Sequence, residues 1–263
     1  MALARSGDRG RLWVTARRQT KGRGRSGRSW SSPEGNLYAS LLLIDPAPVR
    51  IAPELGFVTG VAAAHALRRL LGGDERITIK WPNDILHGKA KVCGILLESA
   101  FLEDGKLACA IGIGVNCQNH PKDTPYPATD LSAAAGVRLT AEDAFLELSM
   151  AMAHWLGIWE AGQHFGVIRS EWLSLAAAIG GLVKVVHPSQ TIEGTFESID
   201  GSGRLILKTA SGRAFIEAGD VFFSPLLTSG TPLGQGGAMA CSDPANAHSL
   251  CEDRQAAAGG LSQ

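Results

Sequence analysis

The chain has 263 residues, of which 45% are hydrophobic and 19% are charged, and its net charge is zero. A chain of this length can form one large domain with a smaller one beside it. It contains no run of about 20 apolar residues that would span a membrane, and its arginine-rich start lacks an apolar signal core. We therefore expect a soluble, cytoplasmic protein.

The positive charge is concentrated near the start of the chain. Nine of the 25 basic residues lie between Arg5 and Arg28, and Asp8 is the acidic residue among them. Such a local field favours a small anion such as a nucleotide over a long nucleic-acid duplex. The five cysteines contain no C-x-x-C pair, so we expect neither a disulfide framework nor a metal site, and we predict buried thiols at Cys93, Cys109 and Cys117.

Alternating hydrophobic residues predict strands in this chain, and alanine- and leucine-rich runs predict helices. Thr140 and Asp143 form a capping-box pattern that marks the start of one helix. A proline-rich connector is expected at 120–136. The expected elements, in chain order, are a helix end at 1–7, strands at 11–19 and 36–44, a helix at 52–71, strands at 77–81, 92–101 and 106–116, and helices at 140–162 and 165–179.

The segment 19–38, QTKGRGRSGRSWSSPEGNLY, interleaves glycines with arginines, and we call it the arginine loop. Glycine permits close approach to a ligand, and guanidinium groups offer paired donors to carboxylate and phosphate oxygens. GRGRSG also fits the G-x-G-x-x-G dinucleotide fingerprint, with Asp45 at the expected distance. That fingerprint requires a helix after the last glycine, and Pro33 and Gly35 break helices. We predict an anion-binding loop.

Lys91 precedes the strand expected at 92–101, after Pro82 ends the previous strand and Asn83 and Asp84 turn the chain. A lysine in this place is often a solvated strand end. Opposite the arginine loop, it can instead hold a carboxylate and neutralise charge on a phosphate. Lys80 is expected to support its strand, and Lys89 to be exposed.

The strand expected at 106–116 places Gly112, Gly114 and Asn116 on one face. A strand face without side chains can seat a ligand, and it can equally make room for a crossing helix. After residue 182 the pattern changes to short alternating strands at 182–186, 191–199, 204–210 and 213–218, which predict a small β-barrel-like module. The Gly-, Ala-, Ser- and Pro-rich residues 225–263 predict a disordered tail.

Three segments together resemble the biotin protein ligases, which adenylate biotin and attach it to a carrier lysine. They are GRGRSGRSW with SPEGNLYASLLL, then ITIKWPNDILHGKAKVCGILLESAF, and KLACAIGIGVN. The resemblance covers roughly residues 5–223 and implies an α+β fold: a central mixed or antiparallel sheet with helices at 1–180 and an SH3-like β-barrel at 181–224. It implies the short form of the family, because a DNA-binding helix-turn-helix of about 60 residues has no room before Gln19.

The resemblance also implies the roles of individual residues. Lys91 and Arg25 are expected to be catalytic. Trp30 is expected to cover the adenine or to anchor its loop, and Arg28 to meet the outer phosphates. The implied biotin-binding residues are Gln19, Gly22, Arg23, Gly24, Arg25, Lys91 and Gly94, and the implied ATP-binding residues are Arg25, Arg28, Trp30, Asp84, Lys91 and Asn116.

The implied reaction has two steps. ATP and biotin form biotinyl-5′-AMP and pyrophosphate, with Mg²⁺ expected on the phosphates, and a lysine of a biotin carboxyl carrier domain then displaces AMP. No nucleic-acid or membrane partner is expected. The residues do not predict the oligomeric state or the identity of the carrier.

In one respect the sequence departs from the family pattern. Members begin with a further strand and a Ser/Thr-rich turn ending in Asn that contacts biotin, and no such segment precedes Gln19. We expect either that Met1 is an internal methionine of a longer reading frame or that the biotin pocket is compromised. One alternative function is therefore an inactive or binding-only fragment. A separate alternative is a lipoate or octanoate transferase of the same superfamily.

Overall fold

The computed structural model describes residues 1–187 and 190–223. The tail predicted to be disordered, with Cys241 and Cys251, lies outside the described residues. Cys93, Cys109 and Cys117 are buried free thiols, which confirms that prediction. Among the described residues, no helix combines the length and apolar character needed to cross a bilayer.

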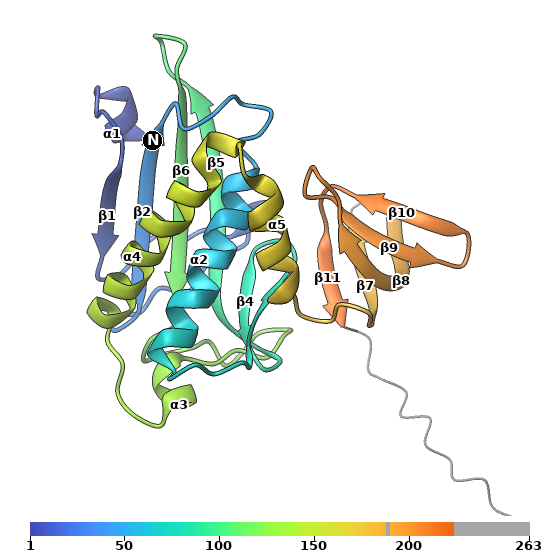
Figure 1. Cartoon of the computed structure of the whole chain (residues 1–263). Helices are drawn as coiled ribbons and strands as arrows, with labels where there is room; N and C mark the ends of the chain where they lie inside the picture. Colours follow the sequence, from blue (N-terminus) through green and yellow to red (C-terminus); the bar gives the residue numbers. More distant parts are fainter. Residues whose placement is uncertain (188–189, 224–263) are drawn as a thin grey trace, which may run out of the picture. The chain divides into compact units, whose positions relative to one another are not determined.

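A six-stranded antiparallel sheet forms the centre of the larger part of the chain (Figure 1). Its spatial order is β1-β2-β6-β5-β4-β3, so β1 and β3 lie at its edges. The alternating pattern of each strand directs one row of side chains into the core, as Ile111, Ile113 and Val115 show. The strands are β1 (Leu12–Ala16), β2 (Leu37–Ile44), β3 (Ile77–Lys80), β4 (Asp84–His87), β5 (Ala90–Phe101) and β6 (Leu107–Val115).

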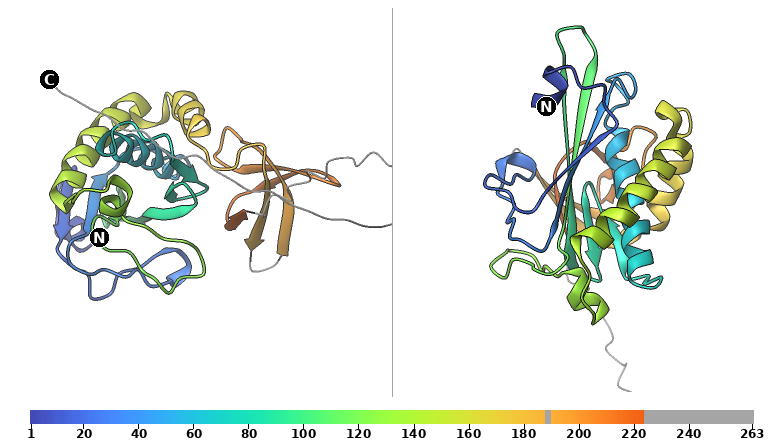
Figure 2. Two further views of the ribbon diagram at one scale, coloured as in Figure 1. Left: turned by 90° about the horizontal axis from the view of Figure 1, so that it is seen from below. Right: turned by 90° about the vertical axis from the view of Figure 1, so that its left-hand side faces the viewer.

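The helices α2 (Glu54–Leu70), α4 (Ala141–Trp159) and α5 (Phe165–Ser174) lie on one face of this sheet. Figure 2 shows this face on the side opposite the arginine loop. Leu55, Val58 and Val61 of α2 are completely buried, because every face of this alanine-rich helix meets the sheet or another helix. Thr140 and Asp143 form the expected capping box of α4. The helices are α1 (Ala2–Arg5), α2 (Glu54–Leu70), α3 (Leu131–Ala135), α4 (Ala141–Trp159) and α5 (Phe165–Ser174).

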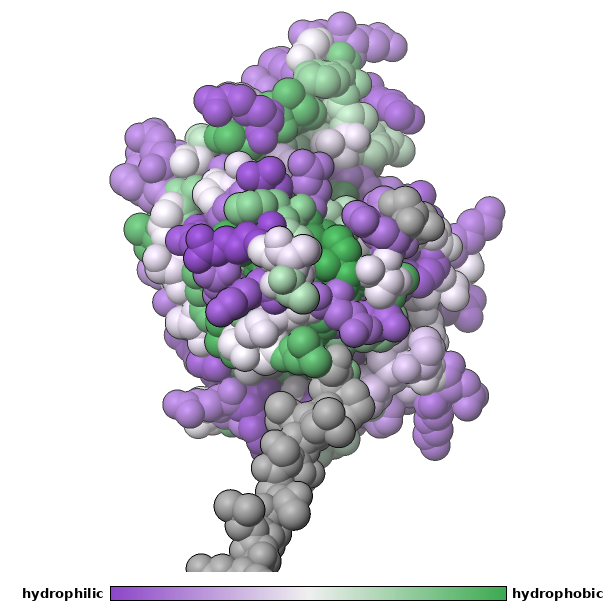
Figure 3. Space-filling view, turned by 90° about the vertical axis from the view of Figure 1, so that its right-hand side faces the viewer, coloured by the Kyte–Doolittle hydropathy of each residue, from purple (hydrophilic) through white to green (hydrophobic). Residues whose placement is uncertain are grey.

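The C-terminal strands form a separate five-stranded antiparallel sheet in the order β10-β9-β8-β7-β11. No pairing between its two end strands occurs within the described residues, so closure into a barrel stays a prediction. Figure 3 views this side of the molecule and shows hydrophobic residues interspersed with hydrophilic ones. The strands are β7 (Leu182–His187), β8 (Gln190–Ile199), β9 (Leu205–Thr209), β10 (Gly212–Ile216) and β11 (Asp220–Phe223).

The structure corrects the expected elements in four places. Asp84 begins the short strand β4 rather than completing a turn, and α3 lies inside the expected connector, where Asp130 caps it by accepting from the Ala133 N–H. The strand β11 was not expected. The expected helix at 165–179 is shorter, because the backbone at 175–177 leaves the helix to exchange hydrogen bonds of 2.7–2.8 Å with Ile79 in β3.

Candidate active site

A pocket of about 270 Å³ opens on the sheet face opposite the helices. Its floor comes from β2, β5 and β6, and the arginine loop, the β3–β4 turn and β11 form its walls. Six basic and three acidic side chains line it, so the lining carries a net charge of +3 when all are ionised. The charged lining residues are Lys21, Arg23, Arg25, Arg28, Lys80, Lys91, Asp84, Glu98 and Asp220.

The backbone of the arginine loop is held by its own hydrogen bonds. The Gly24 N–H donates to Arg28 O at 2.7 Å, and the Trp30 N–H donates to Gly22 O at 3.0 Å. Between these bonds the chain turns through Ser26, whose φ of 55° lies in the left-handed region. Glycines on either side let the chain turn tightly, which keeps successive arginines at the pocket wall.

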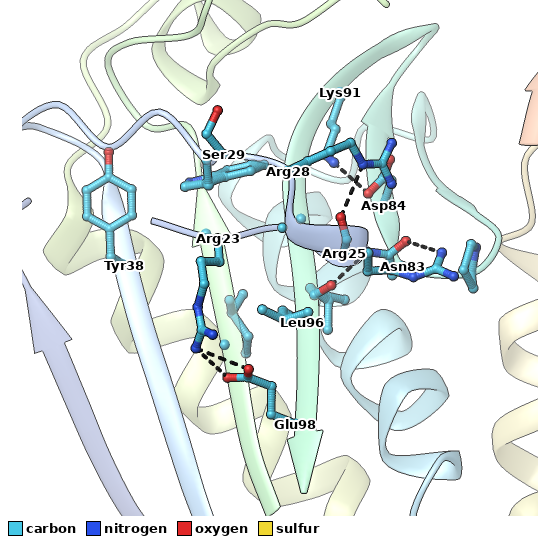
Figure 4. Close-up of a pocket in the computed structure, with 18 of the residues that line it drawn as sticks. Arg23, Arg25, Arg28, Ser29, Tyr38, Asn83, Asp84, Lys91, Leu96 and Glu98 are labelled. Carbon is cyan, nitrogen blue, oxygen red and sulfur yellow. Dashed lines mark hydrogen bonds and ion pairs between the residues drawn. The ribbon is translucent and has the colours of Figure 1, made fainter. Parts of the chain in front are cut away.

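Lys91 lines the pocket and is largely buried. Its Nζ is 2.6 Å from Asp84 Oδ1, and its side chain is 13% exposed. The same ammonium lies 5.2 Å from the Trp30 ring centre and 5.5 Å from that of Tyr126, which is within cation–π range. A flexible lysine side chain is thus restrained on three sides and directed into the pocket (Figure 4).

The backbone of Lys91 is joined to the connector that carries Tyr126. The Lys91 N–H donates to Pro127 O at 2.8 Å, and the Thr129 N–H donates to Lys91 O at 2.9 Å. Asn116 supports this arrangement, because its Nδ2 donates to Thr129 O at 3.0 Å. The connector therefore fixes the backbone position of Lys91.

Arg25 and Arg28 both reach the C-terminal strand β11. Arg25 Nη1 donates to Asn83 Oδ1 at 3.3 Å and to Gly219 O at 3.4 Å. Arg28 Nη2 lies 2.9 Å from Asp220 Oδ1. Burial lowers the pKa of Arg25 from its ordinary value, while the charge of Asp220 acts in the opposite direction. Arginine keeps its positive charge under these conditions, so both guanidiniums remain cationic.

At the other end of the pocket, the polar groups are bonded to one another. Arg23 Nη2 lies 3.1 Å from Glu98 Oε1, with both side chains largely in contact with solvent. Gln19 Oε1 accepts from the Ser32 hydroxyl at 2.9 Å. Tyr38 donates from its hydroxyl to Pro33 O at 2.7 Å, and burial raises its pKa to about 12, so this hydroxyl stays protonated.

Trp30 lies against the glycine faces of β5 and β6. A Cβ atom would come within 2.9 Å of its ring at Gly94 and within 2.8 Å at Gly114. These glycines therefore make room for an indole, and its Nε1 is buried without a hydrogen-bond partner among the described residues. A buried N–H of this kind is an unused donor at the pocket floor.

The structure brings most of the expected site residues together. Gln19, Arg23, Gly24, Arg25, Arg28, Trp30, Asp84, Lys91 and Gly94 all line the pocket. Gly22 and Asn116 do not line it. Gly22 packs against Trp30, Ser32 and Gln19 within the loop, and Asn116 is 3% exposed and bonded to the connector. Their geometry is that of residues that support the pocket wall.

Several lining residues were missed from the sequence. Lys80 was assigned to strand support, although Ile77 and Ile79 on alternate positions of β3 already indicated that Lys80 faces away from the core. Asn83 was treated as a turn residue, and its Nδ2 donates to Ile95 O. For Glu98, Tyr126 and Asp220, no local pattern signals a place in the pocket.

Comparisons with known proteins match both parts of the chain to one family. The model of the "Biotin/lipoate A/B protein ligase family" matches residues 6–116, and that of the "Biotin protein ligase C terminal domain" matches residues 179–224. The chain is 38% identical over 219 residues to the biotin–acetyl-CoA-carboxylase ligase of Paracoccus denitrificans, covering 81% of this chain and 91% of that protein.

Two further proteins, one compared by sequence and one by structure, are also similar to this chain. The bifunctional ligase/repressor BirA of Bacillus subtilis is 34% identical over 219 residues, which cover 79% of this chain and 65% of that protein. The structure of biotin protein ligase from Aquifex aeolicus in complex with biotin and ATP superposes with a TM-score of 0.69 at 28% identity, covering 81% of this chain and 89% of that one.

Proposed function

The chain belongs to the biotin protein ligase family, and we propose that its pocket joins biotin to AMP between Lys91 and Arg25 and then passes the biotinyl group to a lysine of a carrier protein. The family membership makes this protein an ATP-dependent biotin ligase. The observation that carries the site assignment is the convergence of Lys91, Arg25 and Arg28 in one half-buried pocket.

In the first step, a carboxylate oxygen of biotin attacks the α-phosphorus of ATP, and the α–β phosphoanhydride bond breaks. Two anions must approach each other, so the barrier depends on positive charge fixed beside them. Lys91 from β5 and Arg25 from the arginine loop supply that charge. In the second step, the amine of the carrier lysine attacks the biotinyl carbonyl, and AMP leaves with the bonding electrons.

The two ends of the pocket suit the two substrates. We assign the biotin ring to the end near Gln19, the backbone at 22–24 and Gly94, where Gln19 bonds to Ser32 and the charges of Arg23 and Glu98 are paired with each other. The nucleotide is assigned to the end that contains Asp84, Trp30 and Arg28. Asn116 contributes in this scheme by holding the connector behind Lys91, and a direct nucleotide contact is not required of it.

Mg²⁺ is expected to enter with ATP. It prefers oxygen ligands and is usually held by one or two carboxylates together with phosphates and waters. Asp84 fits that description on the nucleotide side of the pocket, and no group of three or more metal-binding side chains occurs within the described residues. The ion would supply charge neutralisation on the phosphates.

The proposal includes the setting of the reaction. The partner is a biotin carboxyl carrier domain of a carboxylase, and the location is the cytoplasm, which agrees with the free thiols of the three described cysteines. The division into a catalytic domain at 1–180 and a C-terminal domain at 181–224 is supported by the two separate sheets. β11 of the C-terminal sheet contributes to the nucleotide end of the pocket.

The test is biotin-dependent exchange of labelled pyrophosphate into ATP by the full chain. We expect exchange with biotin and none when biotin is omitted. Exchange with octanoate or lipoate in place of biotin would support the transferase alternative. Biotin binding without exchange would support a binding-only protein and would contradict the proposed ligase mechanism.

Gly22 provides a prediction about the arginine loop. A Cβ at this position would lie 2.5 Å from Trp30 O, 2.7 Å from Ser32 Oγ and 2.9 Å from Gln19 Oε1. Gly22→Ala should therefore displace the loop and weaken biotin binding by about tenfold or more. Isothermal titration with biotin measures this effect. Gly157→Ala is the control, because Gly157 does not line the pocket and its Cβ would meet no atom within 4 Å; equal affinities for the two variants would contradict the argument.

A further inference from the structure

Lys80 is a cation of the pocket to which no role has been assigned. It is the last residue of β3, where Ile77 and Ile79 face the core and Lys80 faces the pocket. The side chain is half-buried, and its ammonium forms no ion pair or hydrogen bond within the described part of the chain. An ammonium in this state has lost part of its hydration without gaining a carboxylate in exchange, which is unfavourable for stability alone.

The neighbours of Lys80 explain why no carboxylate pairs with it. Lys80 lies directly opposite Asp84 in the β3–β4 register, but Asp84 is engaged by Lys91 at 2.6 Å. Asp220 is engaged by Arg28 at 2.9 Å. The two nearby carboxylates are thus already paired with other cations, so Lys80 adds uncompensated positive charge to the nucleotide end of the pocket.

Aromatic side chains of β11 hold the Lys80 ammonium in place. Its Nζ lies 5.7 Å from the ring centre of Phe222 and 5.6 Å from that of Phe223. Burial lowers the pKa of Lys80, Asp84 and Asp220 raise it, and Lys91 and Arg28 add to the lowering. These contacts restrain the ammonium but leave its three N–H donors without an acceptor among the described residues.

We propose that Lys80 binds the β- and γ-phosphates of ATP and stabilises the pyrophosphate that leaves when biotinyl-5′-AMP forms. This inference rests on the proposed ligase function. When the α–β phosphoanhydride bond breaks, its electron pair goes to the bridging oxygen of the departing pyrophosphate. A restrained ammonium with free donors is suited to this developing charge.

The different positions of Lys91 and Lys80 imply different roles for the two lysines. Lys91 lies near the start of β5, and we place it beside the biotin carboxylate and the α-phosphate. Lys80 ends β3, two strands away from β5 in the sheet and beside β11, so we place it at the part of ATP that leaves. The leaving group is absent from the second step, and Lys80 therefore acts in adenylate formation and not in transfer to the carrier.

The experiment compares Lys80→Met with Lys89→Met in both half-reactions. Lys89 is an exposed lysine in the neighbouring β4–β5 turn and does not line the pocket, so it controls for loss of a positive charge. Pyrophosphate–ATP exchange reports the first step. Transfer from preformed biotinyl-5′-AMP to the carrier domain reports the second step, and it also reports whether the variant is folded.

For Lys80→Met we expect exchange to fall by about 10- to 100-fold, with a raised KM for pyrophosphate, as for the loss of one or two hydrogen bonds to a charged group. Transfer from preformed adenylate should stay within about twofold of wild type, and Lys80→Arg should recover part of the exchange. An unchanged KM for pyrophosphate, or an equal fall in both half-reactions, would overturn the inference. If the wild-type chain shows no exchange, it is the proposed function that fails.

Discussion

Lys91→Met should lower the rate of biotinyl-5′-AMP formation by about 10²- to 10³-fold, the effect of removing one well-placed charge-stabilising group. Methionine keeps the unbranched stem that packs between the rings of Trp30 and Tyr126, so the change removes the charge with little loss of packing. The Nζ of Lys91 is a largely buried ammonium of the pocket, and it is held there by Asp84 at 2.6 Å.

Rapid-quench measurement of adenylate formation under single-turnover conditions tests this result. Lys89→Met again serves as the control and should react at about the wild-type rate. Because Lys91→Met leaves Asp84 without its partner, the unfolding midpoint of each variant should be measured beside its rate. A folded Lys91→Met enzyme that forms adenylate within a few-fold of the wild-type rate would remove Lys91 from the mechanism.

Arg25→Gly should release biotinyl-5′-AMP into solution about 10- to 100-fold faster than the wild-type chain does. Arg25 spans the pocket entrance, since its guanidinium donates to Asn83 Oδ1 at 3.3 Å on the β3–β4 turn and to Gly219 O at 3.4 Å before β11. Without the guanidinium, the arginine loop loses its contacts with Asn83 and Gly219 and keeps the more exposed pairs that Arg28 and Arg23 form with Asp220 and Glu98. The reactive anhydride is then exposed to water and can escape.

Retention is measured by forming labelled adenylate on the enzyme and following its loss after rapid gel filtration. Arg18→Gly is a matched control, because Arg18 is exposed and does not line the pocket. Arg25→Lys should give an intermediate rate, since an ammonium cannot reproduce the planar fork of donors. Retention by Arg25→Gly equal to that of Arg18→Gly would show that the loop does not act as a lid.

Measured together, the two variants distinguish the loss of the Lys91 charge from the loss of loop closure over the adenylate. A Lys91 variant that fails to form adenylate but retains added adenylate would place its effect on the chemical step. An Arg25 variant that forms adenylate but loses it would place that effect on the closed state of the loop. The reverse pattern would exchange the roles that we assign to these two residues.

Much of the fold was accessible from the sequence because it is specified by local patterns. The apolar run LYASLLLI predicts β2, an interior strand that pairs with β1 and β6. The capping box at Thr140 and Asp143 fixes the start of α4. The predictions failed where a distant contact decides. The helix α5 ends at Ser174 because the following backbone bonds to Ile79, almost a hundred positions earlier.

The sequence by itself determined which chemistry the site contains. The spacing of glycines and arginines in the loop, and the lysine that follows KWPND, identify anion-binding groups, because these depend only on residue type and local backbone freedom. Resemblance to the family then supplied their substrates. The sequence also indicated that Gly112 and Gly114 share one strand face, and the structure places Trp30 against Gly114.

The tertiary structure decided how those groups are paired. Arg28 meets Asp220 across 192 positions, and Arg23 meets Glu98 across 75. Within the part of the chain that the structure describes, Lys80 is left without a carboxylate partner because its neighbours Asp84 and Asp220 bind other cations. Such pairings depend on strand order, register and the return of β11 to the pocket. A charge has the same residue type whether or not it is compensated, so only the folded arrangement distinguishes a structural ion pair from a cation available to substrate.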